Sequence, residues 1–206
     1  MPPAFIYFDL GNVLFHFDRD RAMRQMAAVA GVDAAIVHGI VMEGGLQRAL
    51  ERGEIGWPEF HAEFSRRSGS RPDASALARA TSDMFHLNVG MLPVLAACRR
   101  RGVPTGILSN TCDPHWRFLA SGAYAILPGS FREVVLSHEA GAIKPERAIY
   151  ELAAARAGVE PHRIFFCDDL PVHVEAAREA GWDAEVFESA AALSVQLDRR
   201  GLALGL

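Results

Sequence analysis

The chain has 206 residues, of which half are hydrophobic and 22% are charged. A chain of this length buries a sizeable core and favours one domain, or one domain with an insertion. The formal net charge of -4, with 21 lysines and arginines spread along the sequence, excludes a basic footprint for nucleic acid. No apolar stretch approaches the roughly eighteen residues that span a bilayer, and no signal-peptide pattern precedes the first apolar run. We therefore expect a cytoplasmic protein with neither a nucleic-acid nor a membrane partner, whose oligomeric state the sequence does not predict.

The cysteines Cys98, Cys112 and Cys167 are an odd number without a CxxC pair, so we expect reduced thiols rather than a disulfide framework. Cys112 precedes Arg117 in the stretch CDPHWR, which raises the possibility of a cysteine phosphatase. The spacing between them lacks a glycine-rich phosphate loop. A nucleophilic thiol is therefore not favoured.

The first apolar run, FIYFDLGNVL at residues 5–14, predicts a buried strand that ends on Asp9. Gly11 follows in what reads as a flexible turn. A carboxylate at a strand end suits nucleophilic attack on a phosphoryl group, because it can form an acyl phosphate. The turn also suits attack on a phosphoryl group, since a glycine lets backbone amides approach the phosphate oxygens.

Residues 16–87 differ from the rest of the chain, because no strand-like run interrupts them and their apolar residues follow helical spacing. Trp57, Phe60 and Phe64 share one face of a predicted helix, and we expect them to form the core of this segment. The stretch 68–76 reads as a loop. The pattern predicts a small helical insertion after the first strand.

Strand-like runs and helical patterns alternate through the remaining residues. The predicted strands are TGILSNT (105–111), EVVLSHEAGAIKP (133–145), IFFCDD (164–169) and, more weakly, AEVF (184–187). The helical patterns between them cover 91–102, 145–158 and 172–181. This alternation predicts βαβ units and an α/β fold with a parallel sheet flanked by helices.

Polar residues stand at the ends of four predicted strands: Asp9, Ser109, Lys144 and the pair Asp168–Asp169. Ligands of parallel α/β sheets bind at the carboxyl ends of the strands, so we expect these side chains to meet there. Ser109 and its neighbour Asn110 could donate hydrogen bonds to phosphate oxygens, and Lys144 could neutralise their charge. Asp9 and Asp169 offer the hard oxygen ligands that Mg²⁺ prefers. The set predicts phosphoryl-transfer chemistry with Mg²⁺ as cofactor.

These motifs resemble those of the haloacid dehalogenase (HAD) superfamily, in the subfamily that carries a helical cap after the first strand. The four matching stretches are FDLGNVL, ILSNT, KPERAIY and FFCDDLPVHVEAAREAGW, in family order over nearly the whole chain. Within the superfamily, FDLGNV, ERGEI (51–55) and SNT most resemble the bacterial α-D-glucose-1-phosphate phosphatases.

The resemblance implies a Rossmann-like core made of residues 1–15 and 88–206 and a helical cap made of residues 16–87. It implies a Mg²⁺-dependent phosphomonoesterase that acts through a phospho-aspartate intermediate on a small phosphorylated metabolite, expected to be a sugar phosphate such as glucose 1-phosphate. The implied catalytic residues are Asp9, Ser109, Asn110 and Lys144. The implied substrate-binding residues are Gly11, Asn12, Ser109, Asn110, Lys144 and His115, the last in a loop expected to overhang the crevice. The implied metal ligands are Asp9, the backbone carbonyl of Gly11, and Asp169, with Asp168 behind them.

Gly11 departs from the D-x-D pattern of most phosphatases in the superfamily, whose second aspartate is the general acid and base. The glucose-1-phosphate phosphatases share the glycine, so the departure does not exclude activity. General acid–base assistance contributes roughly 10²- to 10⁴-fold to rate. We therefore expect either a preference for esters with good leaving groups or a substitute proton carrier, for which His16 and His115 are the candidates.

Two other functions stay open at this level. A 2-haloacid dehalogenase would use the same aspartate without a metal, but dehalogenases of the superfamily read D-x-Y where this chain has glycine, and the acidic pair suits a metal. A catalytically impaired protein that binds or senses a phosphorylated metabolite would explain the missing second aspartate. Halide release in the first case, or tight binding without turnover in the second, would identify them.

Overall fold

The computed structural model describes residues 2–127 and 129–205. Its centre is a parallel sheet of five strands in the order β5-β4-β1-β6-β7. The strands are β1 (Phe5–Phe8), β4 (Thr105–Ser109), β5 (Glu133–Leu136), β6 (Ile164–Asp168) and β7 (Asp183–Val186). The chain passes from β1 to one side of the sheet and later returns to its other side, so a topological switch point lies at the carboxyl end of β1. The α/β fold is confirmed.

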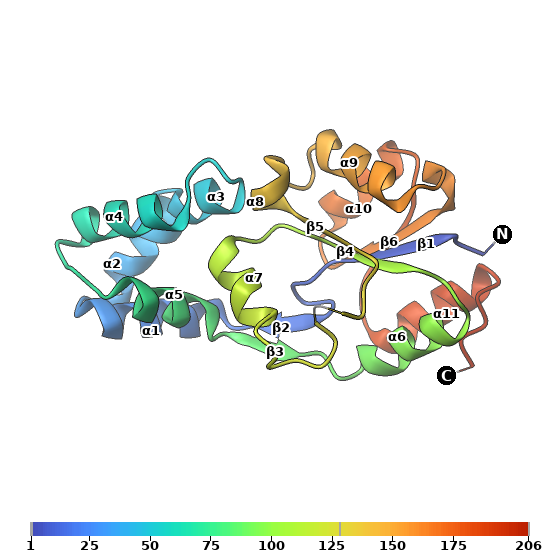
Figure 1. Ribbon diagram of the computed structural model, residues 1–206, viewed down its shortest axis with the longest axis horizontal. Helices are drawn as coiled ribbons and strands as arrows, with labels where there is room; N and C mark the ends of the chain where they lie inside the picture. The colour runs from blue at the N-terminus through green and yellow to red at the C-terminus, as the bar shows by residue number, and fades with distance from the viewer. Residues whose placement is uncertain (1, 128, 206) are drawn as a thin grey trace.

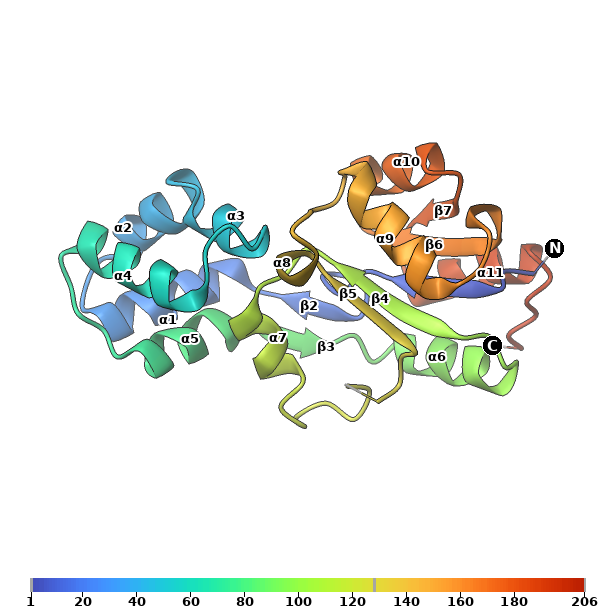
Figure 2. The same cartoon turned by 45° about the horizontal axis from the view of Figure 1, so that its top comes forward.

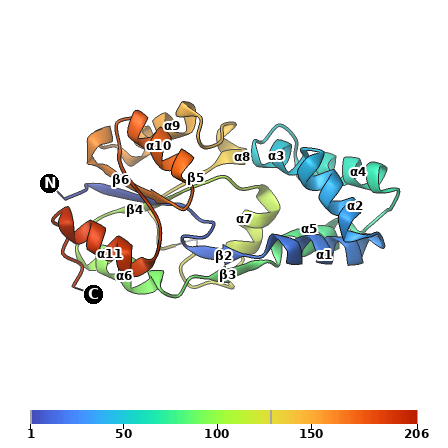
Figure 3. The ribbon, with the colours of Figure 1, turned by 180° about the vertical axis from the view of Figure 1, so that it is seen from behind.

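Helices cover both faces of this sheet (Figure 1). One face carries α9 (Arg147–Ala157) and α10 (Pro171–Glu179), and the other carries α6 (Met91–Arg100) and α11 (Ala190–Arg199), as the view from behind also shows (Figure 3). Each face buries its own apolar cluster, with Tyr7 packed towards α9 and Phe8 on the other side. Because both faces are covered, the central strands read as unbroken apolar runs.

A group of helices forms the insertion beside the sheet (Figure 2). Its elements are α1 (Arg19–Ala30), α2 (Ala34–His38), a π-helical segment (Gly39–Glu43), α3 (Leu46–Glu51), α4 (Trp57–Ser68) and α5 (Ala74–Ser82). Phe60 and Phe64 are fully buried in its core, and Trp57 stacks on Phe60 with ring centroids 4.9 Å apart. The helical insertion after the first strand is confirmed, while its limits at residues 16 and 87 stay a prediction.

A two-stranded antiparallel ribbon joins the insertion to the sheet. It pairs β2 (Phe15–Phe17) with β3 (Phe85–Leu87), so the expectation of no strand within 16–87 was wrong. Strands of three residues are too short to show a period of two in the sequence. The ribbon places Phe17 opposite Phe85 at the entrance to the insertion.

The remaining short helices are α7 (Asp113–Leu119), α8 (Ser137–Ala140) and a 3-10 turn (Pro161–Arg163). Among the described residues, no single helix has the length and apolar character to cross a membrane. The pair Arg19–Ala30 and Ala34–Glu43 meets those criteria when joined, but it is bent by 112°.

Candidate active site

Three carboxylates meet at the carboxyl end of the sheet. Asp9 directly follows β1, while Asp168 ends β6 and Asp169 comes next. These two strands pair in parallel with Phe8 beside Cys167, and the Asp9 amide donates to the Cys167 carbonyl at 3.0 Å. The register therefore sets the carboxylates side by side, with ligand oxygens within 4.8 Å of one another.

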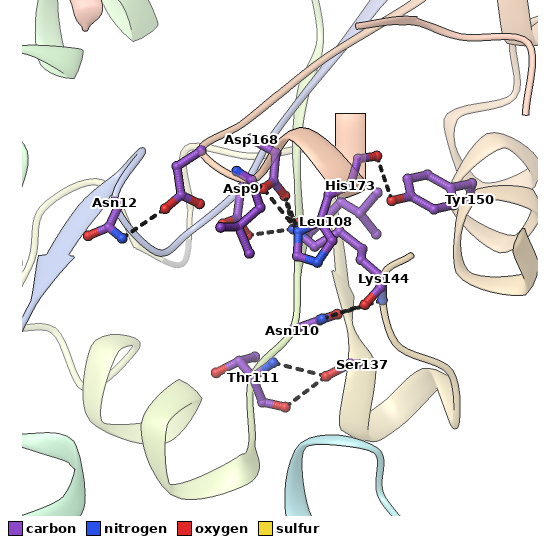
Figure 4. A network of polar contacts seen from close by, with 12 residues as sticks. Asp9, Asn12, Leu108, Asn110, Thr111, Ser137, Lys144, Tyr150, Asp168 and His173 are labelled. Carbon is purple, nitrogen blue, oxygen red and sulfur yellow. Dashed lines mark hydrogen bonds and ion pairs between the residues drawn. The ribbon is translucent and has the colours of Figure 1, made fainter. Parts of the chain in front are cut away.

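Lys144, the only lysine in the sequence, connects two of these carboxylates (Figure 4). Its Nζ donates to Asp9 Oδ1 at 2.7 Å, to Asp168 Oδ2 at 2.5 Å and to the Leu108 carbonyl at 2.9 Å. The side chain is 1% exposed, and the three acceptors use all three donors of the ammonium. A buried charge is tolerated when it is paired and hydrogen-bonded in this way.

Asn110 holds the backbone of Lys144 in place. Its Nδ2 donates to the Lys144 carbonyl at 2.9 Å, and its Oδ1 accepts from the Lys144 amide at 2.7 Å. Lys144 lies beyond α8, eight residues after β5 ends at Leu136, so its expected place at a strand end was wrong. The Asn110 clamp brings this distant residue to the site, a positioning role that the sequence did not indicate.

The charged forms of Asp9, Asp168 and Lys144 are stabilised to different degrees. Burial raises the pKa of Asp9 to about 6, with the Asp168 charge adding to the rise and Lys144 opposing it. Burial would also raise the pKa of Asp168, but Lys144 and the hydrogen bond from His173 outweigh it and hold that pKa at about 2. Although burial disfavours the ammonium, the two carboxylates raise the pKa of Lys144. The cluster thus holds a permanent cation beside one strongly stabilised carboxylate and one weakly stabilised carboxylate.

His173 and Tyr150 form a second layer behind Asp168. The His173 Nδ1 lies 3.0 Å from both Asp168 oxygens, and the Tyr150 hydroxyl donates to the His173 carbonyl at 2.8 Å (Figure 4). The Leu170 amide donates to Asp168 Oδ1 at 2.9 Å. Asp168 is therefore turned towards Lys144 and the protein, whereas half-buried Asp169 accepts only from Asn12 Nδ2, at 2.9 Å, among described residues.

The cluster fits a divalent cation. Three carboxylates and one ammonium leave two negative charges uncompensated, and carboxylate oxygens are the ligands of Mg²⁺. Of the predicted ligands, Asp9, Asp168 and Asp169 are brought together. The backbone carbonyl of Gly11 stays a prediction.

The turn after Asp9 differs from its expected form. The left-handed residue is Asn12, with φ of 55°, and Gly11 does not have a positive φ. Asparagine tolerates this region better than most residues. The Asn12 amide donates to the Phe15 carbonyl at 2.6 Å, which closes the turn. The backbone conformation therefore does not require glycine at position 11.

The remaining predicted residues fall in different places. Ser109 ends β4, directly before Asn110, and is 2% exposed. His115 lies in α7 rather than in a loop, so that expectation was wrong. Its Nε2 is 3.4 Å from Thr81 Oγ1, and burial lowers its pKa to about 4. Whether His115 contacts substrate stays a prediction, as do the catalytic and binding roles of the other residues.

Cys98, Cys112 and Cys167 are all buried free thiols, as expected. Burial raises the pKa of the Cys112 thiol far above its ordinary value, with the charge of Glu51 adding to the rise. Only a thiolate is a good nucleophile. The structure therefore gives no support to a cysteine phosphatase.

The insertion contacts the core at α8. The Ser137 hydroxyl lies 2.5 Å from the Glu51 carbonyl at the end of α3. Arg52 forms an ion pair with Glu146, two residues after Lys144. Gly53 leaves no room for a β-carbon, which would lie 2.3 Å from the His138 carbonyl oxygen. The stretch ERGEI therefore packs against Ser137, His138 and Glu146, close in the chain to Lys144.

Comparisons with known proteins agree with this geometry. The curated relatives include the D-ribitol-5-phosphate phosphatase of Bacteroides thetaiotaomicron, 23% identical over 86% of this chain and 88% of that protein. They also include the enolase-phosphatase E1 of Saccharopolyspora erythraea, 31% identical over 53% of this chain and 45% of that protein. The named relatives thus give no specific support to the resemblance to glucose-1-phosphate phosphatases.

Solved structures share the whole fold. The HAD family enzyme bt-2542 of Bacteroides thetaiotaomicron, in complex with magnesium and inorganic phosphate, superposes with a TM-score of 0.80 at 24% identity, covering 90% of this chain and 94% of that one. The L-2-haloacid dehalogenase of Xanthobacter autotrophicus superposes with a TM-score of 0.64 at 20% identity, covering 96% and 83%. The family model for haloacid dehalogenase-like hydrolases matches residues 5–181. With its carboxylates at the carboxyl ends of a parallel sheet and Lys144 Nζ bound to two of them, the chain belongs to the haloacid dehalogenase-like hydrolase family.

Proposed function

We propose that this hydrolase is a Mg²⁺-dependent phosphomonoesterase that acts on a small phosphorylated sugar or polyol through a phospho-Asp9 intermediate. The observation that carries the proposal is the buried contact of Asp9 with Lys144 inside a cluster of three carboxylates. This arrangement presents a nucleophilic oxygen and a fixed positive charge at one point. Phosphoryl transfer depends on such positioning and charge neutralisation.

Asp9, Asp169 and the Gly11 carbonyl would hold the Mg²⁺ ion, with Asp168 behind them. When bound, the ion would neutralise charge on the phosphate and the carboxylates. The excess of two negative charges in the cluster supports this assignment. The magnesium bound to the similar enzyme of Bacteroides thetaiotaomicron supports it as well.

The chain's own residues account for the chemical steps. An Asp9 carboxylate oxygen attacks phosphorus, the ester P–O bond breaks, and its electron pair leaves with the alcohol oxygen. Lys144 neutralises the phosphoryl oxygens, and Ser109 and Asn110 donate to them. A water molecule then attacks phosphorus, the bond from phosphorus to Asp9 breaks, and the water proton passes to phosphate or solvent. Because the first carboxylate is restored, the cycle needs no other reagent.

The cap would exclude bulk water from this reaction and choose the substrate. Its contacts with the core at Ser137 and Glu146 support this function, since they lie next to the residues that position Lys144. The D-ribitol-5-phosphate phosphatase similarity supports a polyol or sugar phosphate as substrate. A glucose 1-phosphate substrate is a narrower form of the same proposal, supported by the motif resemblance alone.

The test is a phosphate-release screen over sugar phosphates, polyol phosphates, nucleotides and acyl phosphates, with and without Mg²⁺. We expect release that requires Mg²⁺ and that Asp9→Asn abolishes. Full activity of Asp9→Asn would refute the mechanism. Halide release from 2-haloacids without Mg²⁺ would instead identify a dehalogenase. Tight binding of phosphate esters without turnover would identify the impaired binding protein that Gly11 suggests.

A further inference from the structure

The space beside Gly11 is filled by an aromatic ring. A β-carbon at position 11 would lie 3.0 Å from Phe17 Cε1 and 3.5 Å from Phe17 Cδ1. It would also lie 3.9 Å from Asp9 Oδ2, so a side chain there would project beside the nucleophile. The Phe17 ring therefore packs against the point from which a side chain at residue 11 would start.

The local fold holds Phe17 in this place. The turn after Asp9 folds the chain back, with a bridge between Gly11 and Phe15 that leads into β2. Phe17 then pairs in register with Phe85 of β3, and their ring centroids are 6.2 Å apart. Alternation along a strand places Phe17 on the same face as Phe15, whose side chain is fully buried.

A cation lies over this ring. The guanidinium carbon of Arg19 is 5.4 Å from the Phe17 ring centroid. Arg19 is exposed and forms no ion pair within the described residues, unlike Arg21 and Arg24 on the same helix. Arg19 therefore presents a guanidinium, without an ion-pair partner in the described part of the chain, beside the ring that lies against Gly11.

Neither histidine that could replace the missing acid is suitably placed. His16 is exposed and alternates with Phe17 along β2, so it points to the opposite face of the ribbon. His115 is buried against Thr81, and its pKa of about 4 leaves it neutral near pH 7. No proton donor among these candidates faces the leaving group.

We propose that Phe17 and Arg19 replace the acid–base carboxylate and determine leaving-group specificity, an inference that rests on the proposed phosphatase function. When Asp9 attacks, the ester oxygen departs with its electron pair as an oxyanion beside the Arg19 guanidinium. It takes its proton from solvent only afterwards. Within the sugar and polyol phosphates of the proposed function, esters of acidic hydroxyl groups, such as anomeric sugar phosphates, are therefore preferred over the primary alkyl esters of polyols.

The central test is a series of phosphate esters with leaving groups of increasing pKa, measured as kcat/KM in wild type and in variants. In wild type, kcat/KM should fall steeply as the pKa of the leaving group rises. In Gly11→Asp alone this dependence should stay steep, because the Phe17 ring blocks the new carboxylate. Gly11→Asp with Phe17→Leu or Phe17→Ala should flatten the series and raise alkyl ester turnover roughly tenfold or more over wild type.

Phe85→Leu is the matched control, because Phe85 is the cross-strand partner of Phe17 and does not lie against Gly11. In Gly11→Asp with Phe85→Leu, kcat/KM should depend on the leaving-group pKa as steeply as in Gly11→Asp alone. Arg19→Met should lower kcat roughly tenfold with KM changed less, and should steepen the series further. Arg24→Met, which removes an arginine paired with Asp18 on the same helix, should leave both constants and the slope unchanged.

Different failures are distinguishable. If wild type releases no phosphate, or if Asp9→Asn does not abolish the release, the proposed function fails and this inference fails with it. If wild type is an active phosphatase with a shallow series, only the inference is overturned. It is also overturned if Gly11→Asp alone flattens the dependence on leaving-group pKa as much as Gly11→Asp with Phe17→Leu or Phe17→Ala. The folding of these variants is checked by thermal melting.

Discussion

The core residues of the candidate site and the insertion residues beside it are held differently. On the core side, Lys144 is buried and saturated with hydrogen bonds to Asp9, Asp168 and Leu108. On the cap side, Arg19 is exposed, and its guanidinium lies over the Phe17 ring. On the proposed mechanism, the core therefore fixes Asp9 and Lys144 before substrate arrives, as preorganised charge stabilisation requires. Exposed residues on the cap side can change at little cost to the fold, which suits the substrate-selecting role proposed for the cap.

The largest effect should come from the buried cation. Lys144→Met leaves Asp9 and Asp168 buried without their partner, and breaking a buried pair in this way costs about 3–5 kcal/mol. We expect that loss in the free energy of unfolding measured with urea, together with loss of phosphatase activity. Lys144→Arg should also be inactive, because a planar guanidinium cannot reproduce the compact ammonium between its three acceptors.

Arg19→Met is the comparison on the cap side, and it should change the free energy of unfolding by no more than about 0.5 kcal/mol. Equal unfolding free energies for Lys144→Met and wild type would contradict the description of the core side.

A smaller effect should follow from the residue behind Asp168. His173→Ala removes a hydrogen bond that keeps Asp168 turned to Lys144, and outer partners of metal ligands typically contribute 10- to 100-fold to metal affinity. We expect the Mg²⁺ concentration for half-maximal activity to rise by about tenfold. His173→Asn keeps a donor and should recover part of the affinity. Unchanged Mg²⁺ dependence in His173→Ala would exclude this positioning role.

The smallest effect should come from the contact between cap and core. Arg52→Ala breaks the ion pair with Glu146, whose two side chains are 30% and 34% exposed, so stability should change little. We expect KM to rise a few-fold with kcat nearly unchanged, because the cap closes less firmly. Arg66→Ala, which removes an exposed ion pair to Glu63 inside α4, should leave KM as in wild type. Equal effects of the two variants would mean that the Arg52 contact does not support closure.

The sequence predicted the sheet and most of the cluster because buried parallel strands are continuous apolar runs, and their carboxyl ends meet. Asp9 and Asp168 follow directly from that rule. Lys144 does not, since it reaches the site through a separate turn held by Asn110, a contact between residues 34 positions apart. The ribbon of β2 and β3 was missed because its strands have three residues each.

Phe17 shows most clearly what the sequence could not reveal. Gly11 was expected to serve a flexible turn, yet the residue with a positive φ is Asn12. What lies close to Gly11 is the ring six positions later, 3.0 Å from where a β-carbon would be. Such a contact depends on how the chain leaves the turn, and no local pattern of apolar residues records it.

The phospho-Asp9 mechanism is tested by quenching the enzyme in acid during turnover of a phosphate ester with Mg²⁺ and mapping covalent phosphate by mass spectrometry. The mechanism predicts one phosphoryl group on the peptide that contains Asp9. It also predicts that chelation of Mg²⁺ or Asp9→Asn abolishes both the adduct and phosphate release. Phosphate release at the wild-type rate by Asp9→Asn, with no adduct on Asp9, would contradict it.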